Sequence, residues 1–169
     1  MTSEDRFFAL FKPEAGRLYR TAWAILGNEA DAGDAVQETT IRAYRAFDQL
    51  KGGAVAFPAW IRRILVNTCT QIIRKRTRVI PVERPEDLSD EKAADMDLAM
   101  EGDVWDAVRD LDERYRAVVV LRFLNDMQLE DIATALDIPL GTVKSRLHTA
   151  LKLLRTKLQA ENGERRGAV

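Results

Sequence analysis

The apolar residues of this chain recur every three or four positions, which is the period of an α-helix, and no stretch alternates as a β-strand does. In the N-terminal half this recurrence predicts three helices, over about residues 7–26, 31–47 and 58–73. Glycines mark the breaks between them, at Gly27 and at Gly52 and Gly53. Pro58 falls in the first turn of the third helix, a position that tolerates proline. This half is therefore predicted to be helical.

The C-terminal half continues the pattern, with four more helices predicted over residues 98–108, 115–119, 129–136 and 142–159. Only residues 137–141 separate the last two helices, which leaves room for a sharp corner and nothing else. Two helices joined at such a corner form a helix-turn-helix. The apolar side chains with the spacing to fill its inside are Ile132, Leu136, Ile138, Val143 and Leu147. The whole chain is therefore predicted to be all-α.

The last predicted helix has an outer face of short polar and cationic side chains. This face carries Thr142, Lys144, Ser145, His148, Thr149 and Lys152, with Arg146 at its flank. Serine and threonine hydroxyls can bond to base edges or phosphates, and lysine and arginine can neutralise phosphates. Helix-turn-helix proteins place their second helix in the major groove. The pattern therefore predicts DNA binding by the N-terminal half of this helix.

Positive and negative charges are segregated along the chain, although the net charge of its 169 residues is only −1. Residues 62–78 contain six basic side chains and no acidic one, whereas residues 83–113 contain thirteen acidic and three basic ones. Pro81 and Pro85 disfavour helix just before them, so the acidic stretch is expected to begin as a linker. The predicted organisation is a small helical domain at residues 1–78, an acidic flexible linker at 79–97, a second small helical domain at 98–160 and a frayed polar tail at 161–169.

Several classes of function are excluded or weakened by what the sequence lacks. Its single cysteine, Cys69, rules out an internal disulfide and any multi-cysteine metal site. The sequence has no glycine-rich phosphate loop, nucleophile elbow or metal-ligand cluster, so an enzyme is the weakest option and neither a cofactor nor a metal is predicted. The longest apolar runs have five residues, far short of the roughly 20 that span a membrane, and the N-terminus is unlike a secretory signal. We expect a cytoplasmic protein without membrane insertion.

Three stretches of the sequence resemble one protein family. The run LDERYRAVVVLRFLNDMQLEDIATALDIPLGTVKSRLHTALKLLR resembles region 4 of the extracytoplasmic-function group of sigma-70-type bacterial sigma factors. DAGDAVQETTIRAYRAF resembles region 2.2 of these proteins, and FPAWIRRILVNTCTQIIRKRTR resembles regions 2.3 and 2.4. The resemblance covers about residues 5–78 and 98–158. It implies a dissociable, non-catalytic subunit that binds core RNA polymerase, recognises two promoter elements, helps to melt promoter DNA and serves a stress or envelope-response regulon. It also implies an anti-sigma factor as a further partner.

The resemblance assigns tasks to individual side chains. A polar stripe on the second predicted helix would dock on the polymerase through Asp34, Gln37, Glu38 and Arg42. The minus-ten promoter element would be bound by Trp60, Arg62, Arg63, Asn67, Arg74, Lys75, Arg76 and Arg78. A loop at residues 48–57 would receive a flipped base together with Asn67. The minus-thirty-five element would be bound by Arg122, Thr142, Lys144, Ser145, Arg146, His148, Thr149 and Lys152.

Some of these interpretations have alternatives. Trp60 is as suitable for packing in the protein core as for contacting DNA. The acidic linker either masks the two basic domains in the free protein or serves only as a solubilising tether. Family members commonly carry arginine where this chain has Thr149 and Leu151, and leucine where it has Ala35. Because an arginine at position 149 would contact a base or a phosphate, we expect minus-thirty-five recognition to differ or to be weaker without it. Gln128 replaces the usual serine or threonine cap of the sixth helix.

Two other function classes compete: a regulator with a LuxR-type helix-turn-helix that binds DNA without polymerase, and an all-α protein-interaction module.

Overall fold

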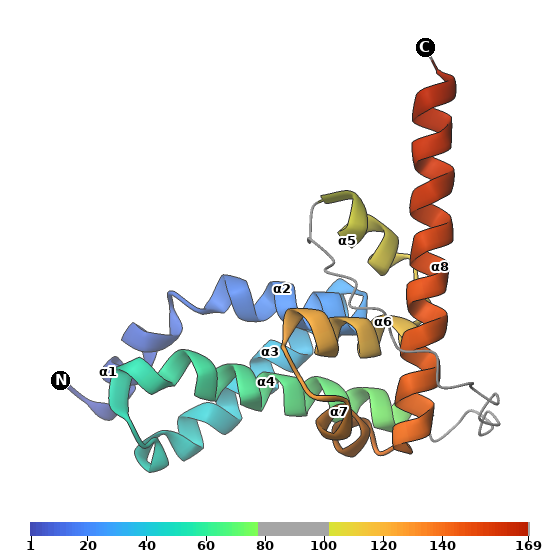
Figure 1. Cartoon of the computed structure of the whole chain (residues 1–169). Helices are drawn as coiled ribbons and strands as arrows, with labels where there is room; N and C mark the ends of the chain where they lie inside the picture. The colour runs from blue at the N-terminus through green and yellow to red at the C-terminus, as the bar shows by residue number, and fades with distance from the viewer. Residues whose placement is uncertain (78–101, 169) are drawn as a thin grey trace. The chain divides into compact units, whose positions relative to one another are not determined.

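A computed structural model describes residues 1–77 and 102–168 of the chain. These residues form two compact helical units, one on each side of the gap, and they contain no β-strand (Figure 1). The all-α prediction is confirmed for them. Arg78 and the predicted linker at residues 79–97 lie outside the described residues.

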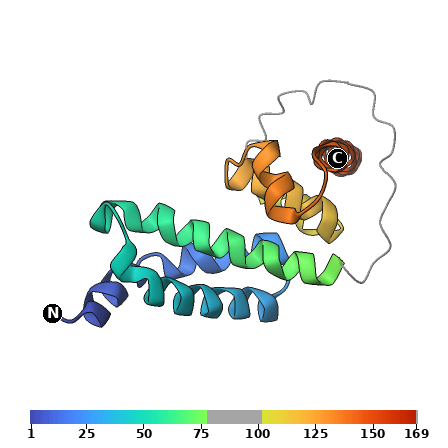
Figure 2. The same ribbon diagram turned by 90° about the horizontal axis from the view of Figure 1, so that it is seen from below.

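The first unit consists of α1 (Ser3–Phe11), α2 (Ala15–Leu26), α3 (Glu29–Ala46), the 3₁₀ turn η1 (Phe47–Gln49) and α4 (Gly53–Thr77). Helices α2, α3 and α4 lie side by side, and each packs against the other two (Figures 1 and 2). Their facing sides bury an apolar core that includes Leu18, Ile25, Ile61 and Leu65. α1 adds Phe7, whose fully buried ring lies 5.4 Å from the ring of Phe47 and 5.8 Å from that of Phe57. Aromatic packing therefore fastens α1 to the three-helix core.

Local side chains set the boundary between α2 and α3. Gly27 ends α2 with a φ of 78°, a left-handed conformation that favours glycine. Asn28 then caps α3, because its side-chain oxygen accepts a hydrogen bond from Asp31 N at 2.9 Å. The break predicted at Gly27 is thus a helix stop followed directly by a helix start.

Three details of the N-terminal prediction are wrong. Residues 7–26 form two helices rather than one, because Pro13 has no N–H with which to continue the hydrogen-bond ladder of α1. α4 begins at Gly53, directly after Gly52 with its φ of 93°, so Pro58 lies inside the helix and not in its first turn. Residues 48–57, expected to be a loop, are consequently mostly helical, and Phe57 at their end is fully buried.

The second unit consists of α5 (Gly102–Arg109), α6 (Glu113–Val119), the π-helical turn η2 (Val120–Leu124), α7 (Leu129–Leu136) and α8 (Leu140–Gly167). α5, α6 and α7 all pack against α8. The corner between α7 and α8 is held by Asp137, which takes a left-handed φ of 55°, and by Ile138 N, which donates to Ala133 O at 3.1 Å. The inside of the corner buries Ile132, Leu136, Val143 and Leu147, while Ile138 is only half-buried. The predicted helix-turn-helix is present, and Gln128, the N-cap residue of α7, makes no capping hydrogen bond with its side chain.

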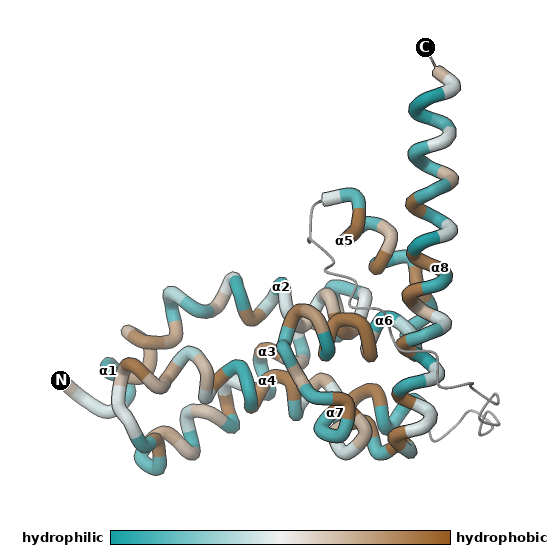
Figure 3. The backbone as a smooth tube through the Cα atoms, in the orientation of Figure 1, coloured by the Kyte–Doolittle hydropathy of each residue, from teal (hydrophilic) through white to brown (hydrophobic). Residues whose placement is uncertain are grey.

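α8 is longer than predicted. It begins at Leu140 and continues to Gly167, so residues 161–167 are helical where a frayed tail was expected. The apolar period stops at Leu158, and the last turns are largely hydrophilic (Figure 3). In these turns Arg165 contacts α5. Arg165 donates to both carboxylate oxygens of Asp103, at 2.9 and 3.2 Å, and these hydrogen bonds lower the pKa of Asp103. Nearer the middle of α8, Lys157 forms an ion pair with Asp110.

Candidate functional site

The N-terminal half of α8 has the two-sided character that the sequence predicted. Its apolar side chains are buried within the second unit, namely Val143, Leu147, Ala150, Leu151 and Leu154. The side chains on the opposite face are exposed or half-buried: Lys144, His148 and Lys152 are exposed, and Thr142, Ser145 and Thr149 are half-buried. A helix built in this way can present its polar face to a groove without disturbing its own core.

Arg146 lies at the flank of this face and is half-buried. Burial lowers the pKa of Arg146, and the positive charge of Arg114 on α6 lowers it further. The guanidinium of Arg114 lies over the ring of Tyr115, 4.7 Å from its centroid. Within the described residues, Nε of Arg146 is buried and makes no hydrogen bond. Because arginine titrates far above neutral pH, Arg146 remains positively charged and can bind a phosphate group of DNA.

Arg122 has a structural task that sequence reasoning missed. Its Nη1 donates to Met127 O at 2.9 Å, which fastens the turn between η2 and α7. In the same turn Asp126 takes a left-handed φ of 52°, and Asn125 Nδ2 donates to Val120 O at 3.3 Å. The half-buried Arg122 therefore positions the start of the helix-turn-helix. A side chain that bonds to a backbone carbonyl across a turn leaves no periodic signal in a sequence.

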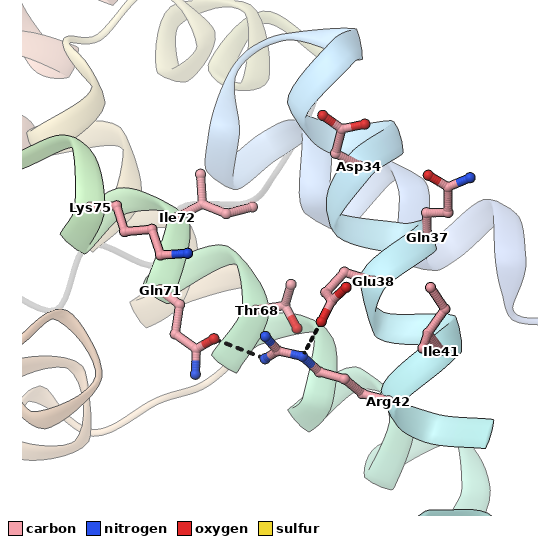
Figure 4. A pocket seen from close by; sticks show the side chains of 9 residues that line it. All are labelled: Asp34, Gln37, Glu38, Ile41, Arg42, Thr68, Gln71, Ile72 and Lys75. Atoms are coloured by element: carbon pink, nitrogen blue, oxygen red, sulfur yellow. Dashed lines mark hydrogen bonds and ion pairs between the residues drawn. The ribbon is translucent and has the colours of Figure 1, made fainter. Parts of the chain in front are cut away.

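The polar stripe on α3 divides into two exposed and two hydrogen-bonded side chains. Asp34 and Gln37 are exposed. Arg42 Nε donates to Glu38 Oε1 at 2.7 Å, and Arg42 Nη1 donates to Oε1 of Gln71 on α4 at 2.8 Å (Figure 4). The four predicted residues therefore do share one surface, and Gln71 joins them from another helix.

That surface is one wall of an open pocket of about 470 Å³ between α3 and α4. The α4 wall includes Thr68, Gln71, Ile72 and Lys75 (Figure 4). Sequence reasoning placed Lys75 with the DNA-binding residues and gave Gln71 no task. The only signal in the sequence is their spacing of four residues, which puts them on one face of a helix.

The side chains predicted for the minus-ten element do not form one surface. Arg62, Arg63 and Asn67 are exposed on α4. Arg76 instead forms an ion pair with Asp31 in the first turn of α3, and Lys75 lines the pocket. Arg74 is half-buried, and Arg78 lies outside the described residues. The basic run is therefore divided between open surface and the side of α4 that faces α3.

Trp60 combines the two positions considered for it. It is half-buried, and its ring lies 5.8 Å from that of the buried Phe57 at an interplanar angle of 46°. One part of the indole thus packs on the core while another part reaches the surface of α4.

The described residues were compared with the requirements of a metal site, a reactive thiol and a membrane span. They contain no cluster of histidine, cysteine, aspartate or glutamate that could hold a metal ion. Burial raises the pKa of the Cys69 thiol to about 12, so little nucleophilic thiolate forms at neutral pH. None of the described helices has the length and apolar character needed to cross a membrane.

Comparison with known proteins assigns both units to one family. The model of sigma-70 region 2 matches residues 10–79, and that of sigma-70 region 4 matches residues 101–154. The ECF RNA polymerase sigma factor SigE of Mycolicibacterium smegmatis is 33% identical over 162 residues, covering 92% of this chain and 62% of SigE. RNA polymerase sigma factor SigV of Bacillus subtilis is 35% identical, covering 85% of this chain and 86% of SigV. The chain belongs to the extracytoplasmic-function sigma factors.

A solved structure supports the fold of this sigma factor. The sigma factor RpoE of Bartonella quintana, crystallised with the anti-sigma factor NepR, is 26% identical and covers 88% of this chain and 96% of that one, with a TM-score of 0.52. The family predicted from the sequence is confirmed. Membership makes the chain a regulatory subunit of transcription rather than an enzyme, and it decides against a LuxR-type regulator and a plain interaction module.

Proposed function

We propose that this sigma factor is a dissociable, non-catalytic subunit that binds core RNA polymerase in the cytoplasm, directs it to specific promoters and assists their melting. The proposal rests mainly on the α7–α8 corner, where α8 buries its apolar side and exposes its cationic side. The first unit adds an exposed polar stripe on α3 and exposed cations on α4. Two DNA contacts and one polymerase contact can therefore be divided between the two units.

The N-terminal half of α8 is proposed to enter the major groove of the minus-thirty-five element. The exposed Lys144 and Lys152 would neutralise phosphates, while Ser145 and His148 would face base edges. Thr142, Arg146 and Thr149 would meet the backbone or bases at the flank, and Arg122 would hold the turn before α7 and contact a neighbouring phosphate. No side chain caps the start of α8, so its first amides add to the positive potential there.

The exposed stretch of α4 is proposed to handle the minus-ten element. Arg62, Arg63 and Arg74 would hold the backbone of the melted strand, Asn67 would bond to an unstacked base, and the accessible part of Trp60 would stack on one. Lys75 and Arg76, which are turned toward α3, and Arg78 remain predictions from the sequence.

The α3 stripe is proposed to dock on core polymerase through Asp34, Gln37, Glu38 and Arg42. The solved relative was crystallised with an anti-sigma factor, and we propose that this sigma factor also has such a partner and serves a stress or envelope-response regulon. The anti-sigma factor would compete for surfaces needed by the polymerase or the promoter.

Binding assays with purified bacterial core polymerase test the proposal. Fluorescently labelled sigma factor should bind core in solution, and the complex should retain a subset of duplexes from a random promoter library that neither component retains alone. If the labelled chain binds no core and the mixture selects no duplexes, the proposed function is wrong.

A further inference from the structure

The pocket between α3 and α4 joins a surface that the sequence predicted to one that it did not. Its α3 wall is the stripe proposed for polymerase docking, and its α4 wall carries Gln71 and Lys75. Figure 4 shows the polar ends of Glu38, Arg42 and Gln71 meeting between the two helices. The hydrogen bond from Arg42 to Gln71 therefore joins the two walls, and they form one surface.

The charges in this pocket are only partly neutralised. The positive charge of Arg42 is balanced by Glu38, which accepts its hydrogen bond at 2.7 Å. Asp34 on the α3 wall and Lys75 on the α4 wall have no ion pair among the described residues. Ile41, with 44% of its surface exposed, adds an apolar contact area beside them. A ligand in this pocket would therefore meet a carboxylate on one side and an ammonium group on the other.

Lys75 is set apart from the basic side chains with which the sequence groups it. At about 100° per residue, it lies about 120° around α4 from Arg63 and about 140° from Arg62. The next residue, Arg76, is also directed toward α3, because it pairs with Asp31. Lys75 thus directs its positive charge into the pocket beside α3 and away from the surface of Arg62 and Arg63.

We propose that Lys75 and Gln71 complete the polymerase-docking surface, so that the pocket receives a helix of core polymerase with a basic residue opposite Asp34 and an acidic residue opposite Lys75. The inference rests on the proposed function, since it adds an α4 wall to the α3 stripe. Opposite charges on facing walls fix the direction in which such a helix lies, which favours one partner over others. Lys75 is thereby reassigned from minus-ten DNA to the polymerase.

Gln71 acts in this surface as a positioning residue. Its Oε1 accepts a hydrogen bond from Arg42 Nη1 at 2.8 Å, and Arg42 in turn holds the Glu38 carboxylate. Gln71 is exposed, so its contribution to the core of the first unit is small. Its loss should free Arg42 and Glu38 to move, and the docking surface should lose its fixed shape.

Charge reversal at Lys75 tests the proposal. The affinity of labelled Lys75→Glu for core polymerase is measured first, and the affinity of saturated polymerase complex for a forked minus-ten DNA is measured separately. We expect the affinity for core to fall about tenfold or more, because a like charge now faces the acidic residue of the partner, with DNA affinity unchanged. Lys12→Glu is the matched control: it makes the same charge change at an exposed lysine between α1 and α2, outside every proposed surface, and should leave core affinity unchanged.

A variant of Gln71 separates positioning from a merely structural role. Gln71→Leu should weaken core binding without lowering the thermal unfolding midpoint, whereas a merely structural role would lower the midpoint as well. Circular dichroism checks that each variant is folded, and Lys75→Met replaces Lys75→Glu if the latter is not. The inference is wrong if Lys75→Glu weakens fork-DNA binding but not core binding, or if core affinity is unchanged in the Lys75 and Gln71 variants. If the unaltered chain itself binds no core, the proposed function fails instead.

Discussion

Lys144→Ala tests how the exposed face of α8 contacts DNA. Lys144 is exposed and follows the fully buried Val143, so its truncation leaves the core of the corner intact. Each phosphate that a protein neutralises adds about 0.9 to the slope of log affinity against log salt concentration. If Lys144 makes one such contact, the unaltered protein binds DNA more tightly than Lys144→Ala, and the ratio of the two affinities should fall by about 3.5-fold between about 50 and 200 mM salt.

The assay titrates the polymerase complex against a promoter duplex over a series of KCl concentrations. Lys157→Ala is the matched control, because Lys157 lies on the same helix but is paired with Asp110. We expect a slope lower by about 0.9 for Lys144→Ala and an unchanged slope for Lys157→Ala. A loss of preference at one base pair with an unchanged slope would refute the phosphate contact in favour of a base contact, and an unaltered affinity at every salt concentration would refute both.

Three further predictions concern stability. Leu147→Ala should lower the free energy of unfolding of the second unit by about 2–5 kcal/mol in urea titrations, because this side chain is 97% buried, whereas Leu153→Ala at a site 46% exposed should cost much less; equal losses would contradict the packing of the corner. Asn28→Ala should remove the cap of α3 and cost about 1 kcal/mol, seen as a lower thermal midpoint than that of Asn28→Asp, which keeps a capping oxygen. The Cys69 thiol, with its pKa raised to about 12, binds its proton more tightly in the folded chain than in the unfolded chain. Its contribution to the free energy of unfolding is therefore complete below the unfolded pKa of about 8.5 and is lost as pH rises toward 12. Between pH 8 and 10 the unaltered chain should therefore lose about 2 kcal/mol more than Cys69→Ala, and parallel losses would count against a buried thiol.

The helical period predicted the elements that bury an apolar stripe against near neighbours in the sequence. α7 has the predicted bounds, and α8 turns the predicted Val143 and Leu147 inward, because both helices are held by hydrophobic packing within one helix-turn-helix. The corner itself was also predictable, since five residues between two amphipathic helices leave few alternatives. The same period could not detect the break at Pro13, because apolar residues continue in register on both sides of it.

The features that the sequence did not reveal depend on polar contacts between distant residues. In the last turns of α8 Arg165 bonds to Asp103, 62 positions earlier, and hydrophilic turns of this kind look like a tail in the sequence. Gln71 becomes part of the candidate docking surface through its bond to Arg42, 29 positions away. Lys75 and Arg76 belong to a basic run in the sequence, but their directions are set by their place around α4 and by Asp31 on α3. Charge runs thus predict where cations are and leave open which partner each one faces.

Run-off transcription with purified bacterial core polymerase, with and without this sigma factor, tests the central claim most directly. Across a library of promoter fragments, we predict that a subset yields transcripts only when the sigma factor is present, each starting at a fixed distance downstream of the two recognised elements. A library that yields no transcript dependent on the sigma factor would contradict its proposed role in initiation.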